Sequence, residues 1–169
     1  MASGKKNSIA VLMGSQSDLE VMSGCIEQLK AFGIEPLVRI ISAHRTPAQA
    51  AGFAKTAAKK GIKVIIAGAG MAAHLAGAMA ANTTLPVIGV PLDAGQGLKG
   101  LDALLSTFQM PPGVPVATVS IGKAGAKNAA ILAVQILALS DKSLSKKLSQ
   151  FKKQQVQKAL DQNKKLHSN

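Results

Sequence analysis

Three polar segments of this chain each follow a short apolar run, and they contain residue types that carry out acid–base chemistry or bind anions. The first, residues 14–18, reads GSQSD. A tight glycine turn with two serines would leave free backbone amides at the start of a helix, which is typical of a phosphate site. Asp18 could instead cap that helix or accept hydrogen bonds from ribose hydroxyls. An ordinary N-cap box would explain Ser17 or Asp18 alone, but explains the other serine and the glycine less well.

The second segment, residues 42–47 (SAHRTP), contains a candidate proton carrier. An imidazole exchanges protons near neutral pH, so His44 could act as both acid and base. The guanidinium of Arg45 offers a planar, bidentate grip on phosphate or carboxylate. A loop histidine is often only a surface residue. The strand-end position beside an arginine favours a catalytic role for His44.

The third segment, residues 68–75 (GAGMAAHL), consists mainly of small residues. Small residues let the backbone approach a planar ligand closely, and its free amides could bind a carboxylate or CO2. For His74 we favour a structural role near the start of a helix over direct proton transfer. Three quieter segments follow later strands. Residues 93–100 could form a lid, residues 109–113 could line or shape the pocket, and residues 122–128 could supply polar contacts.

The elements that must position these segments alternate along the chain. Five short runs rich in β-branched residues predict buried strands at residues 8–13, 36–41, 62–67, 86–91 and 115–121. Helical segments are predicted at residues 18–32, 47–60, 72–81, 101–108 and 124–139.

Local signals agree with these boundaries. Gly33 and Gly61 stand where a glycine would end a helix, and Thr46-Pro47 reads as an N-cap followed by a first-turn proline. The strand–helix alternation predicts an α/β fold, a flavodoxin-like three-layer α/β/α sandwich around a five-stranded parallel sheet. Ligands of such sheets bind beyond the carboxyl ends of the strands, where all three polar segments fall.

Length and charge divide the chain into two predicted parts. The 169 residues fit one α/β catalytic domain, residues 1–140, followed by a basic helical extension, residues 141–169. The extension holds eight lysines and two aspartates, which is half of the net charge of +12. It lacks arginine and interleaved aromatic residues, so we favour a solvated helix face over a nucleic-acid arm. Its thin apolar stripe predicts packing on the core or on a neighbouring subunit.

Several classes of function are disfavoured. The single cysteine, Cys25, excludes an intrachain disulfide and is interpreted as a small buried hydrophobe. There is no phosphate loop of the Walker type, no GxGxxG after the first strand and no cluster of metal-binding side chains, so we expect neither a metal nor a cofactor. The polar N-terminus lacks the apolar stretch of a secretory signal, and no apolar run approaches the length of a membrane span. The prediction is therefore a cytoplasmic protein without membrane or nucleic-acid partners.

Six motifs in order give the chain a resemblance to a known family. GSQSD, SAHRTP, GAGxAAHL, PVIGVP, LDALLSTFQMPPGVPVATV and IGKAGAKNAA together resemble the N5-carboxyaminoimidazole ribonucleotide mutases over residues 9–139. Many mutases have glycine where Met71 stands and proline where Ala76 stands, and an aromatic residue is often found where Leu19 stands. Met71 adds bulk over the presumed carboxylate site.

The resemblance implies an activity and a set of site residues. It implies conversion of N5-carboxyaminoimidazole ribonucleotide to 4-carboxy-5-aminoimidazole ribonucleotide in de novo IMP synthesis, by a homo-oligomer, an octamer, whose C-terminal helix reaches a neighbour. His44 would be the catalytic acid–base. The small-molecule substrate would be bound by a set of residues drawn from the three polar segments: Ser15, Ser17, Asp18, Ser42, Ala43, Arg45, Ala69, Gly70, Met71, Ala72, His74 and Leu75.

Within that set, the resemblance gives roles to particular groups. Ser15, Asp18 and Arg45 would bind the ribonucleotide, with Arg45 near the phosphate, while Ser42 and the amides of residues 69–72 would hold the migrating carboxylate. Two alternatives stay open at this point. The first is a related enzyme that carboxylates aminoimidazole ribonucleotide directly with CO2, although that class carries lysine where Arg45 stands. The second is a nucleotide-binding module without catalysis.

Overall fold

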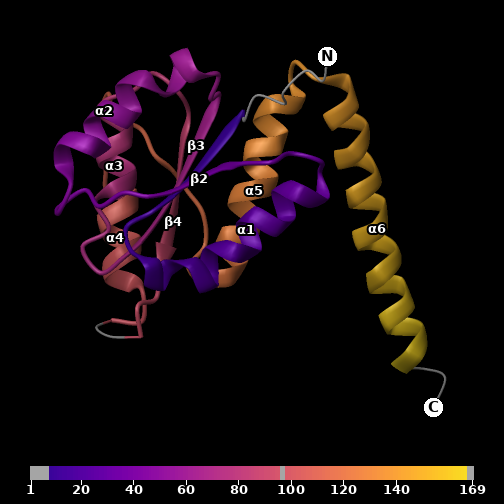
Figure 1. Ribbon diagram of the computed structural model, residues 1–169. Coiled ribbons are helices and arrows are strands. Elements are labelled where there is room, and N and C mark those ends of the chain that lie inside the picture. The colour runs from indigo at the N-terminus through magenta and orange to yellow at the C-terminus, as the bar shows by residue number, and fades with distance from the viewer. Residues whose placement is uncertain (1–7, 96–97, 167–169) are drawn as a thin grey trace. The chain divides into compact units, whose positions relative to one another are not determined.

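A five-stranded parallel sheet forms the centre of the fold in the computed structural model, which describes residues 8–95 and 98–166. Its strand order is β2-β1-β3-β4-β5 (Figure 1). This is the flavodoxin-like order, so the predicted fold class is confirmed. The strands are β1 (Ile9–Met13), β2 (Leu37–Ile40), β3 (Val64–Gly70), β4 (Val87–Leu92) and β5 (Ala117–Thr118).

Helices cover both faces of this sheet. In Figure 1, α2, α3 and α4 lie on one face, and α1 and the first part of α5 lie on the other. No described helix is long and apolar enough to cross a membrane. The helices of this part of the chain are α1 (Leu19–Ala31), α2 (Pro47–Ala57), α3 (Leu75–Ala80), α4 (Leu101–Phe108) and α5 (Gly122–Ala138), with 3-10 turns η1 (Gln16–Asp18) and η2 (Ala58–Lys60).

Strand register aligns the loops that carry the polar segments. Met13 at the end of β1 is the partner of Ile40 in β2 on one side and of Gly68 in β3 on the other. The three loops that follow these strands therefore leave the sheet at one edge. The central strands are aliphatic and every residue of β1 is fully buried, as expected for a parallel strand covered by helices on both faces.

Two boundaries differ from the sequence prediction around the third polar segment. The strand β3 continues to Gly70 instead of ending at Ala67, because Ala69 and Gly70 still pair with β4 at Pro91 and Leu92. The helix α3 begins at Leu75 instead of Ala72. The last strand, β5, is only two residues long. The predicted helix ends at Gly33 and Gly61 are confirmed by their left-handed φ angles of 79° and 89°.

Close packing at Gly125 in the first turn of α5 gives a stability prediction. A Cβ atom there would overlap the Ser120 carbonyl oxygen, whereas at Gly24 in α1 it would lie 3.6 Å from the Lys127 Cγ atom, an ordinary van der Waals distance. We expect Gly125→Ala to lower the free energy of unfolding by about 1–3 kcal/mol or more because backbone must move. Gly24→Ala is the matched control and should raise it by up to about 1 kcal/mol. Urea denaturation measures both, and equal stability of the two variants would contradict the packing argument.

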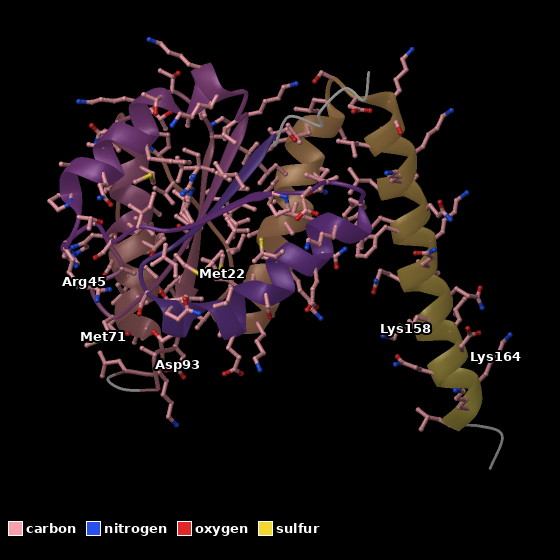
Figure 2. The ribbon with its side chains drawn as sticks, in the orientation of Figure 1. Met22, Arg45, Met71, Asp93, Lys158 and Lys164 are labelled. Carbon is pink, nitrogen blue, oxygen red and sulfur yellow. The ribbon has the colours of Figure 1, made fainter. Side chains whose placement is uncertain are left out.

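Residues 134–169 form a second compact unit, in which the described part is dominated by α6 (Lys142–Leu166). The helix begins where it does because the Asp141 carboxylate accepts hydrogen bonds from the backbone N–H groups of Ser143 (2.8 Å) and Leu144 (3.1 Å). All eight of its lysines are exposed, and Figure 2 shows Lys158 and Lys164 extending from the helix. Val156 and Leu160 are also exposed on α6.

Candidate active site

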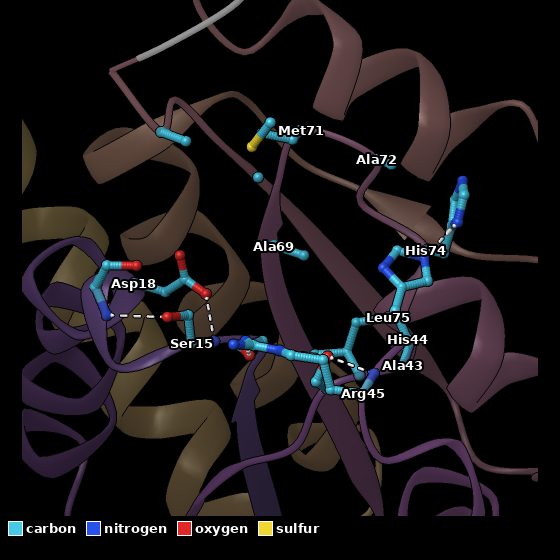
Figure 3. A pocket seen from close by; sticks show the side chains of 15 residues that line it. Ser15, Asp18, Ala43, His44, Arg45, Ala69, Met71, Ala72, His74 and Leu75 are labelled. Carbon is cyan, nitrogen blue, oxygen red and sulfur yellow. Dashed lines mark hydrogen bonds between the residues drawn. The ribbon is translucent and has the colours of Figure 1, made fainter.

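A pocket of about 410 Å³ lies beyond the carboxyl ends of the strands, and Figure 3 shows it from close by. All of the site residues expected from the sequence line it. Two further residues, Gly14 and Ala94, complete the wall. The full lining is Gly14, Ser15, Ser17, Asp18, Ser42, Ala43, His44, Arg45, Ala69, Gly70, Met71, Ala72, His74, Leu75 and Ala94.

The first loop is organised by a reciprocal capping box. The Ser15 backbone N–H donates to the Asp18 carboxylate (2.9 Å), and the Ser15 hydroxyl accepts from the backbone at the start of the next turn. The capping alternative considered for this segment is therefore present. Ser15 and Ser17 still line the pocket, so the same loop can cap the helix and contact a ligand.

The Asp18 carboxyl is shifted by its surroundings. Burial raises the pKa of Asp18 above its ordinary value. Hydrogen bonds from the Ser15 and Gly14 backbone and the positive charge of Arg45 act in the opposite direction without cancelling the effect of burial. This half-buried carboxyl lies on the pocket wall, where it can accept hydrogen bonds from a hydroxyl-bearing ligand.

Internal hydrogen bonds close the second loop around His44. The Thr46 hydroxyl donates to the Ser42 carbonyl oxygen (2.9 Å) and accepts from the Ser42 N–H (3.1 Å). Thr46 occupies the N-cap position of α2 and Pro47 the first turn, as predicted, but the Thr46 side chain makes no cap hydrogen bond. The hydroxyl closes the loop instead, which holds the three residues between Ser42 and Thr46, including His44 and Arg45, on the pocket wall.

Arg45 links the second loop to the first. Its backbone N–H and its Nε both donate to the Ser42 hydroxyl, at 3.1 and 3.3 Å, and its Nη2 donates to the Gly14 carbonyl oxygen at 2.8 Å. The guanidinium thus lies over the GSQSD turn (Figure 3). Its remaining N–H donors are not used by these hydrogen bonds. The backbone N–H groups of Gly14, Ser15, Ser17 and Asp18 already donate within the protein. The guanidinium is therefore the group of this wall that is suited to hold a phosphate.

The third loop turns sharply at Met71, whose φ angle is 54°. After this turn the His74 N–H donates to the Ala72 carbonyl oxygen (2.8 Å), and His74 occupies the N-cap position of α3 without a side-chain cap bond. The imidazole is therefore left for another contact. The turn explains why α3 starts later than predicted, because residues 72–74 are used to redirect the chain across the end of β3.

The two histidines of the pocket meet. His44 Nε2 lies 2.8 Å from His74 Nδ1, and the rings are edge to face with centroids 5.0 Å apart (Figure 3). One of these nitrogens donates and the other accepts, so the tautomer of each ring depends on that of the other. The sequence interpretation of His74 as a residue near the helix start is correct for its backbone. It did not anticipate that the side chain reaches His44, 30 positions away.

Not every segment singled out in the sequence reaches this pocket. Of the loop at residues 93–100, Ala94 lines it, whereas residues 109–113 and 122–128 do not. Ala94 was missed as a site residue, although the pairing of β3 with β4 as far as Leu92 makes the following loop emerge beside Gly70. In Figure 2, Arg45, Met71 and Asp93 lie at the same end of the α/β unit.

The described residues contain no group of three or more His, Cys, Asp or Glu side chains that could hold a metal ion. Cys25 is buried in α1, and burial raises the pKa of its thiol to about 12. A thiol with that pKa is protonated at neutral pH and makes a poor nucleophile. Among the groups that line the pocket, the imidazoles of His44 and His74 can exchange protons near neutral pH, and Arg45 can stabilise negative charge.

Comparison with known proteins agrees with this arrangement. A family model described as AIR carboxylase matches residues 8–158. Proteins named N5-carboxyaminoimidazole ribonucleotide mutase match from Saccharolobus solfataricus (57% identity, covering 85% of this chain and 89% of the relative) and Bacillus subtilis (51%, covering 90% and 94%). The crystal structure of PurE from Treponema denticola superimposes with a TM-score of 0.81 at 32% identity, covering 94% of this chain and 97% of that one.

Proposed function

The chain belongs to the AIR carboxylase family, and from this we propose that it is an N5-carboxyaminoimidazole ribonucleotide mutase in which His44 carries the proton. The enzyme is an isomerase of purine biosynthesis: it moves one carboxyl group from the exocyclic nitrogen of an aminoimidazole ribonucleotide to ring carbon C4. The single observation that supports the role of His44 is its hydrogen bond to His74 inside a pocket that Arg45 also lines.

The reaction balances because His44 donates one proton in the first step and takes one back in the second. In the first step the C–N bond of the carbamate breaks, CO2 leaves, and the nitrogen takes a proton from the His44 imidazolium. In the second step C4 forms a bond to the same CO2, and the C4 proton passes to the now neutral His44. No oxidant, reductant or cofactor is needed. Holding CO2 beside C4 avoids its recapture from solution, a proximity effect of up to about 7–11 kcal/mol.

The remaining pocket residues are assigned by the charge of the substrate group that each would contact. We assign the phosphate to Arg45, beside the GSQSD turn, and the ribose hydroxyls to Asp18. The Arg45–Gly14 contact of 2.8 Å and the raised pKa of Asp18, caused by burial, support this division. The backbone of residues 69–72 and Ser42 would hold the carboxylate, because the small side chains of that loop leave its amides accessible.

His74 is proposed as a positioning residue for His44. Because the rings share one proton at 2.8 Å, His74 restricts both the orientation and the tautomer of His44. We expect His74→Phe, which removes the partner nitrogen, to lower kcat by about 10-fold and to shift the pH profile of kcat. His74→Asn, which can still hydrogen bond, should recover part of the loss. A purely structural role would predict reduced thermal stability in both variants with an unchanged pH profile.

An ultraviolet assay with the carbamate substrate tests the proposed function. With N5-carboxyaminoimidazole ribonucleotide supplied and bicarbonate removed, the protein should form the C4-carboxylated product. A direct carboxylase would instead form it from aminoimidazole ribonucleotide and CO2. A nucleotide-binding module would bind the substrate and form no product. Either of the last two results would overturn the proposal.

We also propose that the enzyme is a homo-oligomer, an octamer, and that residues 141–169 pack on the core or on a neighbouring subunit. Exposed apolar side chains on two helices support association, because large exposed patches of this kind mark interfaces. They are Leu101, Leu105 and Phe108 on α4, and Val156, Leu160 and Leu166 on α6. Light scattering gives the molar mass to compare with the chain mass of 17.3 kDa. The cytoplasmic location stays a prediction.

A further inference from the structure

Met71 has an unusual backbone conformation for its residue type. Its φ angle of 54° lies in the left-handed region, where among the described non-glycine residues only Lys99 joins it. That region crowds Cβ against the backbone, so glycine or asparagine would occupy the position with less strain. A strained residue at the wall of a reaction pocket invites a functional explanation for its side chain.

The Met71 side chain lies where its neighbours in the loop can contribute no bulk. Ala69 and Ala72 end at Cβ, and Gly70 cannot carry a side chain without crowding, since its Cβ would lie 3.1 Å from the Ala94 Cβ and 3.2 Å from the Leu92 carbonyl oxygen. Met71 is 53% exposed and lines the pocket. Figure 3 shows it beyond Ala69 at the end of β3, with its side chain turned to the Asp18 side of the view.

A long apolar group at this place suits one stage of the proposed reaction. The carboxylate of substrate and product can be held by backbone amides, but CO2 itself is small, uncharged and weakly hydrogen bonded. Between its release from nitrogen and its addition to C4, CO2 can also escape to solvent. A flexible thioether can follow the contents of the pocket and exclude water, because methionine adapts its shape to irregular gaps.

On these observations, and on the basis of the proposed function, we infer that the Met71 side chain covers the carboxylate end of the pocket and retains CO2 between its release and its addition to C4. Met71 then determines the source of the carboxyl group: the CO2 that adds to C4 is the one released from the same substrate molecule. It does not donate or accept the proton.

Isotope exchange at low conversion tests this inference. Unlabelled substrate is converted in buffer containing ¹³C-bicarbonate and carbonic anhydrase, and mass spectrometry gives the labelled fraction of product; a reaction without enzyme corrects for spontaneous decarboxylation. Met71→Ala and Met71→Gly should incorporate at least about threefold more label than wild type, because the cover is lost. Met71→Leu keeps an apolar side chain and should stay near the wild-type value.

The two small variants separate side chain from backbone. Met71→Gly relieves the left-handed strain and should raise the melting temperature above that of Met71→Ala, while both should leak CO2 equally. Label incorporation that stays at the wild-type level in both variants, in a protein that converts the substrate normally, would overturn the inference and leave the mutase function intact. Absence of conversion by wild type would overturn the proposed function itself, and full exchange in wild type would show that no retention exists.

Discussion

Replacing His44 with asparagine is expected to lower kcat by about 10²–10⁴-fold while the affinity for substrate stays within a few-fold of wild type. Asparagine can still hydrogen bond to His74, but it cannot carry a proton between the two half-reactions. Two hydrogen bonds between Ser42 and Thr46, of 2.9 and 3.1 Å, close the loop. Removing the imidazole should therefore not displace Arg45. Steady-state kinetics gives kcat, and calorimetry gives the substrate affinity.

Gln49→Ala is a suitable control for this variant. Gln49 is exposed in the first turn of α2, close in sequence to His44, and it does not line the pocket. It should leave both kcat and affinity unchanged. If His44→Asn turned over substrate at a near-normal rate, the assignment of His44 as proton carrier would be wrong, and the pocket would need another acid–base group.

Replacing Arg45 with lysine is expected to weaken substrate binding by about 10- to 100-fold, because hydrogen bonds to a charged group contribute about 1.5–3 kcal/mol. An ammonium can keep the charge but cannot reproduce the planar fork, nor donate to Ser42 and Gly14 while also contacting a phosphate. Titration calorimetry with the ribonucleotide measures the effect. Competition by inorganic phosphate should weaken in parallel if the guanidinium meets the phosphate.

The other arginine of the chain provides a matched control. Arg39 lies on the exposed edge strand β2 and does not line the pocket, so Arg39→Lys should bind substrate as wild type does. Equal affinity of Arg45→Lys and wild type would exclude Arg45 from the phosphate site. In that case the phosphate would have to lie on another part of the pocket wall.

The flavodoxin-like fold could be predicted from local patterns. Apolar β-branched runs, glycines that end helices and the regular alternation of elements each depend on residues close together in the chain, and strand–helix–strand units allow few topologies. The main errors fell where local signals are weak. Gly68-Ala69-Gly70 has low strand propensity, yet it continues β3 because β4 provides hydrogen-bonding partners as far as Leu92.

For the site, the sequence alone determined which three segments would face the pocket, because strand ends of a parallel sheet gather at one edge and the polar segments occupy those ends. Only the tertiary structure decided how they act on one another. The His44–His74 bond joins residues 30 positions apart, and the Arg45–Gly14 bond joins residues 31 apart. Such contacts depend on the turn at Met71 and on strand register, which are fixed by packing between elements and cannot be derived from local propensity.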